Sequence, residues 1–171
     1  MKLPLAPAVL LLLAGAGAAS AQQPNLGCSR APSANQTQTL RCGSGVTIVA
    51  ESGAQFTLLD RDSNGRVDAV DLQSKAVFVE APKKKAGKPF EVITPQAIAA
   101  VRGTKWAVDA EGAKTSVFVD TGRVAVRRVA APGQVVLGPG EGVDVDTGTA
   151  PLEVKRWGAP RVAALMARLG R

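Results

Sequence analysis

Short stretches in which apolar and polar residues alternate dominate the chain after residue 40. Apolar residues at every second position place one face of a strand in a core and the other face in solvent. The pairs predicted to face inward are Trp106 and Val108, Val117 and Val119, Val124 and Val126, and Val143 and Val145. Their polar neighbours are predicted to face solvent: Lys105, Asp109, Ser116, Asp120, Arg123, Arg127, Asp144 and Asp146. The pattern predicts a packed β structure with one solvated side.

Glycines separate these runs at intervals of 9, 10, 11 and 9 residues, at Gly103, Gly112, Gly122, Gly133 and Gly142. Turns at this spacing predict an all-β fold, either β-solenoid-like or a sandwich of short strands. Upstream, residues 46–51 and 55–59 are two strand-like runs separated by Ser52 and Gly53, and they predict a hairpin. Residues 81–89 contain prolines, a glycine and four lysines, which predicts a solvated connection rather than an anion-binding segment.

The last segment has a helical period instead. Apolar residues lie at i, i+3, i+4 and i+7, at Val162, Leu165, Met166 and Leu169. Pro160 suits a first helical turn and Gly170 suits a stop, so a short amphipathic helix is predicted over 160–169. It is expected to cover an open end or edge of the β structure, because so short a helix is marginal without packing. The alternative is that it rests on a membrane surface or a partner, with Arg161 and Arg168 away from the apolar stripe.

The first 21 residues have the arrangement of a secretory signal peptide. Lys2 precedes an apolar stretch, residues 3–18, and Ala19-Ser20-Ala21 form a cleavage site. A membrane anchor is the alternative, but prolines interrupt the stretch and it is short for a bilayer span. We therefore expect a periplasmic or secreted protein with no transmembrane anchor after cleavage. The predicted parts are a signal peptide (1–21), an extended N-terminal arm (22–39), a β domain (40–157) and a C-terminal helix (158–171).

The cysteines, the net charge and the lack of histidine exclude several classes of function. Cys28 and Cys42 are the only cysteines, so one disulfide is predicted, and in the chain-entropy model such a loop contributes about 3 kcal/mol. The formal net charge of +7 suits anionic partners such as an acidic polysaccharide or an acidic protein surface. Scattered cations and few aromatic residues argue against nucleic acid. The chain has no histidine, which removes Ser-His-Asp triads and most zinc sites, so no enzyme is predicted.

Residues 60–71 have the spacing of a calcium-binding loop. Oxygen-bearing side chains stand at positions 1, 3, 5, 9 and 12 of the loop, at Asp60, Asp62, Asn64, Asp68 and Asp71. The carbonyl of Arg66 would add a ligand, and Gly65 at position 6 lets the backbone turn around the ion. Asp71 replaces the usual bidentate Glu, however, and strand-like segments flank the loop. A structural calcium site and a solvated turn without metal are the two alternatives.

One stretch resembles a known family. Residues 90–108, F-E-V-I-T-P-Q-A-I-A-A-V-R-G-T-K-W-A-V, are similar to the FecR domain signature F-x-V-x-T-P-x-A-x-A-x-V-R-G-T-x-F-x-V. The motif residues are Thr94, Pro95, Val101, Arg102, Gly103, Thr104 and Trp106, the last standing where the family more often has Phe. Pro95 favours a bend and Gly103 a tight turn. Arg102 is expected to lock that turn by hydrogen bonds to backbone carbonyls or a carboxylate.

The resemblance implies an all-β, solenoid-like domain of cell-surface signalling. Family members that regulate sigma factors have a cytoplasmic region, one transmembrane helix and a periplasmic region that senses an outer-membrane TonB-dependent receptor. Here a signal peptide stands in place of the first two parts, so direct anti-sigma action is not expected. The function predicted is a non-enzymatic interaction or scaffold module with an envelope protein as partner. The alternative is an envelope- or polysaccharide-binding protein with a structural calcium site.

Overall fold

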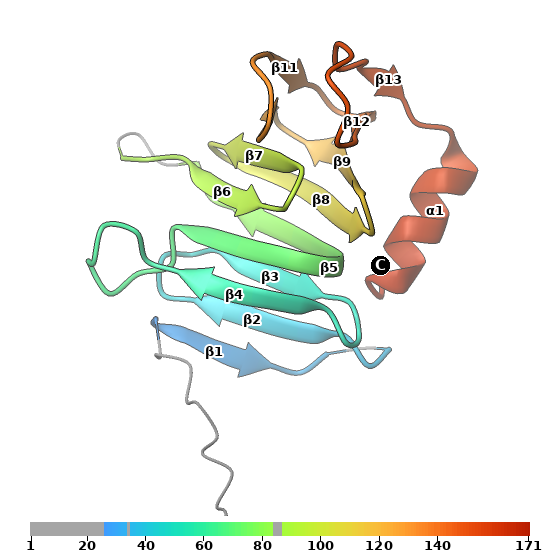
Figure 1. Ribbon diagram of the computed structural model, residues 1–171. Coiled ribbons are helices and arrows are strands. Elements are labelled where there is room, and N and C mark those ends of the chain that lie inside the picture. Colours follow the sequence, from blue (N-terminus) through green and yellow to red (C-terminus); the bar gives the residue numbers. More distant parts are fainter. Residues whose placement is uncertain (1–25, 34, 84–86) are drawn as a thin grey trace, which may run out of the picture.

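The computed structural model describes residues 26–33, 35–83 and 87–171, and these form an all-β fold with one short C-terminal helix (Figure 1). The predicted fold class is therefore confirmed. Residues 1–21, predicted as a signal peptide, lie outside the described residues, and so does the start of the predicted arm. In the described part of the chain, no helix has the length and apolarity needed to cross a bilayer.

The strands join into one curled sheet. Their bounds are β1 (Cys28–Ala31), β2 (Gln38–Cys42), β3 (Thr47–Ala50), β4 (Gln55–Leu59), β5 (Ala69–Ala81), β6 (Phe90–Ile93), β7 (Ala97–Val101), β8 (Thr104–Glu111), β9 (Lys114–Thr121), β10 (Val124–Arg128), β11 (Gln134–Leu137), β12 (Glu141–Val145) and β13 (Lys155–Arg156). The helix α1 spans Ala159–Arg168.

The long strand β5 connects the two halves of the sheet. Its first part pairs with β4 and with β6, and its second part pairs with β3 and β8. Between the two parts Lys75 has a positive φ of 64°, which bends the strand. Half A has the order β1-β2-β3-β5-β8-β9-β12-β13, and half B has the order β4-β5-β6-β7-β10-β11. The bend brings the inner faces of the two halves together.

The predicted hairpin of residues 46–51 and 55–59 is wrong. These residues form β3 and β4, but β3 pairs with β2 and β5, whereas β4 pairs with β5 alone. The turn at Ser52 and Gly53 therefore carries the chain from half A to half B instead of folding it back on itself. The reason is β5, which is long enough to offer each run its own partner segment. A hairpin requires that β3 and β4 pair with each other, whereas here both pair with the more distant β5.

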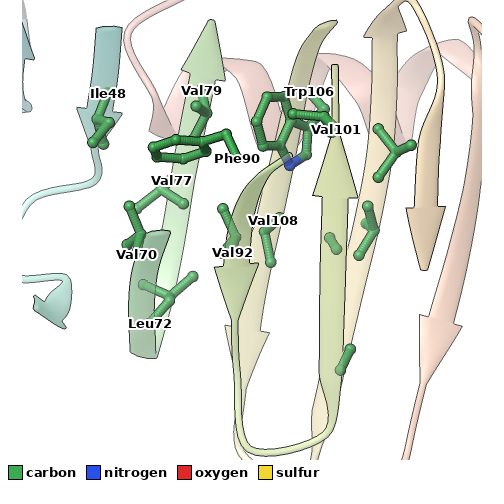
Figure 2. Close-up of a cluster of buried hydrophobic side chains, with 14 of the residues drawn as sticks. Ile48, Val70, Leu72, Val77, Val79, Phe90, Val92, Val101, Trp106 and Val108 are labelled. Atoms are coloured by element: carbon green, nitrogen blue, oxygen red, sulfur yellow. The ribbon is translucent and has the colours of Figure 1, made fainter. Parts of the chain in front are cut away.

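An apolar inner cluster fills the space between the two halves (Figure 2). All eight residues predicted to face inward are at most 1% exposed. Phe90 and Trp106 meet edge to face, with ring centroids 6.2 Å apart, and Val79 and Val101 lie beside them. Burial of these side chains supplies most of the driving force for folding, at about 1.5–3 kcal/mol for each large apolar side chain.

A second apolar cluster, the outer cluster, lies on the other face of half A. It consists of Val49, Ala76, Phe78, Ala107, Phe118, Trp157, Leu165 and Leu169, the last two from α1 and its C-cap. The helix was predicted to cover an end or an edge of the β structure, and it covers a face instead (Figure 1). For the same reason two of the residues predicted to face solvent, Asp109 and Ser116, are buried beneath it.

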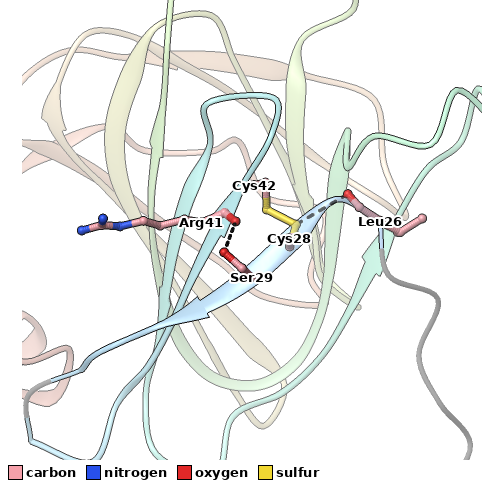
Figure 3. Close-up of a disulfide and its surroundings, with 5 residues drawn as sticks. All are labelled: Leu26, Cys28, Ser29, Arg41 and Cys42. Atoms are coloured by element: carbon pink, nitrogen blue, oxygen red, sulfur yellow. Dashed lines mark hydrogen bonds between the residues drawn. A yellow bond between two sulfur atoms is a disulfide. The ribbon is translucent and has the colours of Figure 1, made fainter.

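The N-terminal arm contributes a strand to the sheet. Residues 28–31 form β1, which pairs with β2 at the edge of half A and keeps its side chains largely exposed. Cys28 lies directly opposite Cys42, and the two form the predicted disulfide (Figure 3). The hydroxyl of Ser29 donates a hydrogen bond to the carbonyl of Arg41, 3.5 Å away. The disulfide thus anchors the edge strand to the inner cluster, to which Cys42 belongs.

Candidate functional site

The Thr94-Pro95 part of the motif holds a buried turn between β6 and β7. The Thr94 hydroxyl oxygen accepts the N–H of Ala97 at 2.9 Å and lies 2.8 Å from the Thr115 hydroxyl on β9. Thr115 donates to the Gln96 side-chain carbonyl at 2.9 Å, and the single Thr94 proton is shared between the Thr115 hydroxyl and the carbonyl of Ala97, 3.1 Å away. All three side chains are buried, and the Gln96 amide also reaches the carbonyl of Gly112. The threonine therefore ties half B to the β8–β9 hairpin of half A.

The Gly103-Thr104 part of the motif packs against another turn. Gly103 has φ +75°, and Lys83 crosses it so closely that a Cβ atom at Gly103 would clash with the lysine stem. Gly122, at φ +94°, would place a Cβ 2.7 Å from the Gly103 carbonyl. The Thr104 hydroxyl donates to the carbonyl of Arg123 at 3.0 Å. The two turns need glycine because their backbones lie in contact.

Arg102 and Trp106 complete the motif. The Arg102 guanidinium donates to the carbonyl of Gly87 at 3.2 Å, the backbone role predicted for it, although the loop it holds is the one before β6. Trp106 is fully buried, and its indole N–H has no hydrogen-bond partner among the described residues. A phenylalanine, which has no N–H, would leave no such unpaired donor. The motif residues thus hold turns at both ends of β7 and part of the core between them, and we call the end that carries Arg102 and Gly103 the motif end.

Two grooves open at the motif end, on either side of Ala81 and Pro82. The larger has a volume of about 360 Å³ and is lined by Thr47, Glu80, Lys83, Gly103, Thr104, Lys105 and Thr121, among others. The smaller, of about 40 Å³, is lined by Val46, Val67, Asp68, Lys88, Phe90, Val101 and Arg102, among others. Lys83 and Lys105 line the larger groove, and Lys88 and Arg102 line the smaller one. Positive charge therefore borders both grooves.

Four cations at this end lack an acidic partner. Lys83, Lys88, Arg102 and Arg123 make no ion pair with any described carboxylate. Val101 of β7 pairs with Val124 of β10, and the same register continued by one position places Arg102 opposite Arg123. Like charges in such positions repel each other. We call these four residues the motif-end cations.

The cations around α1 are arranged in the opposite way. Arg168 bonds to both Glu51 and Asp109 at 2.7 Å, Arg161 bonds to Asp144 and stacks on Trp157, and Arg171 bonds to Glu80. Burial by itself raises the pKa of Glu51, but its bonds to Arg168 and to the Ala76 N–H hold that pKa below its ordinary value. The pKa of Asp144 is likewise lowered, since Arg161 and Ser116 outweigh its burial.

The residues predicted as calcium ligands lie on an exposed loop and at the start of β5. Burial by itself raises the pKa of Asp60, but its carboxylate accepts the N–H groups of Gly65 and Asn64, and the hydrogen bonds of the turn together hold that pKa below its ordinary value. Asp68 pairs with Arg61 at 3.1 Å, and Asp71 accepts from Gln73. No described group of three or more acidic, cysteine or histidine residues converges as metal ligands do. Asp62 and Arg66 lie on the same exposed turn, and calcium binding stays a prediction.

Sequence reasoning missed the convergence of cations at the motif end. It treated residues 81–89 as a solvated connection and Arg123 as one of several exposed residues. A signal was present, because V-R-G at 101–103 is mirrored by G-R-V at 122–124. Mirrored triplets of this kind are what two antiparallel strands show when their ends and turns lie side by side. Pairing the two strands would have brought the arginines together.

The comparisons with known proteins agree with this arrangement. The model of the FecR protein family matches residues 31–125, which include the whole motif. Two crystal structures of a protein from Parabacteroides distasonis ATCC 8503, described as a "putative anti-sigma factor", share the fold with a TM-score of 0.61 and 23% identity. The match covers 76% of this chain and only 60% of that protein. A search of curated proteins found no match.

Proposed function

The chain belongs to the FecR protein family, and from that premise we propose that it is an exported, non-enzymatic protein-interaction module that serves cell-surface signalling. The family links the chain to such signalling, and the disulfide is consistent with an extracytoplasmic location. The anti-sigma description belongs to the Parabacteroides protein, of which this chain spans 60%. A role as an accessory of a signalling pathway needs only a protein partner in the envelope.

The motif end carries this proposal. Gly103 and Thr104 hold its turns through close backbone contacts and a hydrogen bond, and Thr94 holds the turn at the other end of β7, so these residues are not arranged around a reacting group. Around the Gly103 turn lie two grooves, and three of the cations that line them, Lys83, Lys88 and Arg102, have no acidic partner among the described residues. A concave, charged surface on a rigid β scaffold suits recognition of a partner.

Site-specific photo-crosslinking of the exported full chain tests the proposal. A photoreactive residue at Thr121, which lines the larger groove, is compared with one at Thr57, an exposed position on β4. We expect a discrete protein adduct from the envelope at one or both positions. The proposal fails if neither position gives a protein adduct while the chain is retained on acidic polysaccharide in a salt-sensitive way. That outcome would instead support the envelope- or polysaccharide-binding alternative.

We also propose that residues 60–71 hold a structural calcium ion. The turn already directs the backbone around Asp60, and Asp62 and Asn64 lie on the same exposed stretch. Loops of the extracellular type bind calcium with a dissociation constant of about 0.1–1 mM, so millimolar calcium is expected to raise the melting temperature. Asp60→Asn and Asp62→Asn together are expected to abolish the increase. An identical melting temperature in calcium and in chelator would show that the segment is a turn that binds no calcium.

A further inference from the structure

The motif-end cations differ from the arginines around α1, because none of the four has an acidic partner among the described residues. Around α1, the three arginines that face the sheet each bind a carboxylate. At the motif end, both acidic residues that line the grooves already have a cation of their own. Glu80 bonds to Arg171 at 2.5 Å, and Asp68 bonds to Arg61 at 3.1 Å. Negative charge from the described part of the chain therefore does not balance Lys83, Lys88, Arg102 and Arg123.

The shape of this end also limits what could provide the missing charge. The larger groove, at about 360 Å³, lies within the size range of sites that enclose part of a ligand. It is a hollow lined by strand ends and turns of half A, from β3, β5, β8 and β9, whereas a bilayer surface needs a flat or convex face. The aromatic residue of the smaller groove, Phe90, is buried against Trp106 and offers no ring on which a sugar could stack.

From the charge and the shape we infer that the grooves bind an extended acidic segment of a partner protein, with its carboxylates on Lys83, Lys88 and the two arginines. This inference rests on the proposed function and adds the surface and the chemistry of the partner. Carboxylates accept charge-assisted hydrogen bonds from lysine and, in a bidentate manner, from arginine. A bound acidic segment would relieve the repulsion between Arg102 and Arg123. It would also attract the partner from a distance.

Fluorescence anisotropy tests this with a labelled peptide of alternating glutamate and glycine and with the same peptide carrying glutamine for glutamate. The test variant is Lys83→Gln with Lys88→Gln, because both line the grooves and neither side chain makes an ion pair or a hydrogen bond in the described structure. The control variant, Lys114→Gln with Arg127→Gln, removes the same charge from the ends of β9 and β10 that lie opposite the motif end.

We expect the glutamate peptide to bind and the glutamine peptide not to bind. Two exposed charge contacts at about 0.2–1 kcal/mol each predict that the test variant weakens binding by up to about thirtyfold, whereas the control variant changes it by less than about twofold. Arg123→Gln alone is expected to weaken binding by a smaller factor. Higher salt is expected to weaken binding to the unmodified chain.

Three results would overturn the inference. Equal losses in the test and control variants would show that net charge alone attracts the peptide. Binding to phosphatidylglycerol vesicles without binding to the peptide would assign the cations to a lipid surface. A photo-adduct at Thr57 but not at Thr121, with no peptide binding, would place the partner elsewhere while leaving the proposed function in place. Circular dichroism of each variant guards against loss of fold.

Discussion

The central strands of half A, β5, β8 and β9, are largely buried on both faces, and the two faces are built differently. The inner face packs against half B and is entirely apolar around Trp106. The outer face packs against a single helix of ten residues and is bordered by ion pairs from Arg161, Arg168 and Arg171. Strands from the whole chain build the inner face, whereas the last fifteen residues cover the outer one. We infer that the inner cluster sets global stability and that α1 can open locally.

The largest effect is expected from the centre of the inner cluster. Trp106→Ala leaves a large cavity and should cost about 3–5 kcal/mol in the free energy of unfolding. Trp106→Phe should cost less than about 1.5 kcal/mol, because it keeps a large ring and removes the N–H that lacks a partner. Urea denaturation measures both, with the exposed Val129→Ala as control. Equal costs for alanine and phenylalanine would contradict the assigned role of ring volume.

The next effect concerns the cover of the outer face. Leu165→Ala removes an anchor of α1 that is 5% exposed, and we expect a cost of about 2 kcal/mol, at the low end for leucine because the helix can shift to fill the space. Amide hydrogen exchange should rise throughout α1 while β8 stays protected. Ala163→Ser, on the exposed side of the helix, is the matched control. Equal acceleration of exchange in β8 would show that the two faces unfold together.

A smaller effect is expected from the border of ion pairs. Arg168→Met keeps much of the stem but leaves Glu51 and Asp109 without their cation, at a cost of about 1 kcal/mol, since the arginine is 39% exposed. Denaturation at two salt concentrations should show that salt narrows the difference between the variant and the unmodified chain. Arg30→Met, on the exposed edge strand β1, removes no ion pair with a described carboxylate and serves as control.

The two faces also differ in how far the sequence could predict them. Alternation located the inner residues, because a strand with one apolar face has only one way to bury it. It failed for Asp109 and Ser116, which are polar and yet buried. Their burial depends on Arg161 and Arg168, which lie more than forty residues away in the chain, and no local pattern encodes that pairing. The wrong hairpin at residues 52–53 has the same origin, since the partner of both strands is the distant β5.

The candidate site was predictable to a similar degree. The motif predicted the turn at Gly103 and a backbone role for Arg102, both of which follow from local chemistry. The grooves and the unpaired cations arise only when β7 and β10 lie side by side and Lys83 crosses Gly103. The helix, too, was predictable only in its local features. Its period predicted α1 to within a residue, but the face it covers is a property of the assembled sheet.

The smallest effect is the response of the outer face to acid. Glu51 and Asp144 have folded-state pKa values below their ordinary ones, so their contribution to stability is complete above the unfolded-state pKa and is lost as pH falls through the folded-state value. Their arginine partners remain charged throughout this range. We therefore expect α1 to loosen below about pH 4, with no change between pH 5 and 8.

In a Trp106→Phe background Trp157 is the one remaining tryptophan of the chain, and its fluorescence reports on the helix. Adding Arg168→Met should weaken the acid response, because Glu51 then loses its partner at every pH. A transition centred near pH 6, or one that Arg168→Met leaves unchanged, would show that the border of ion pairs does not control the stability of the helix.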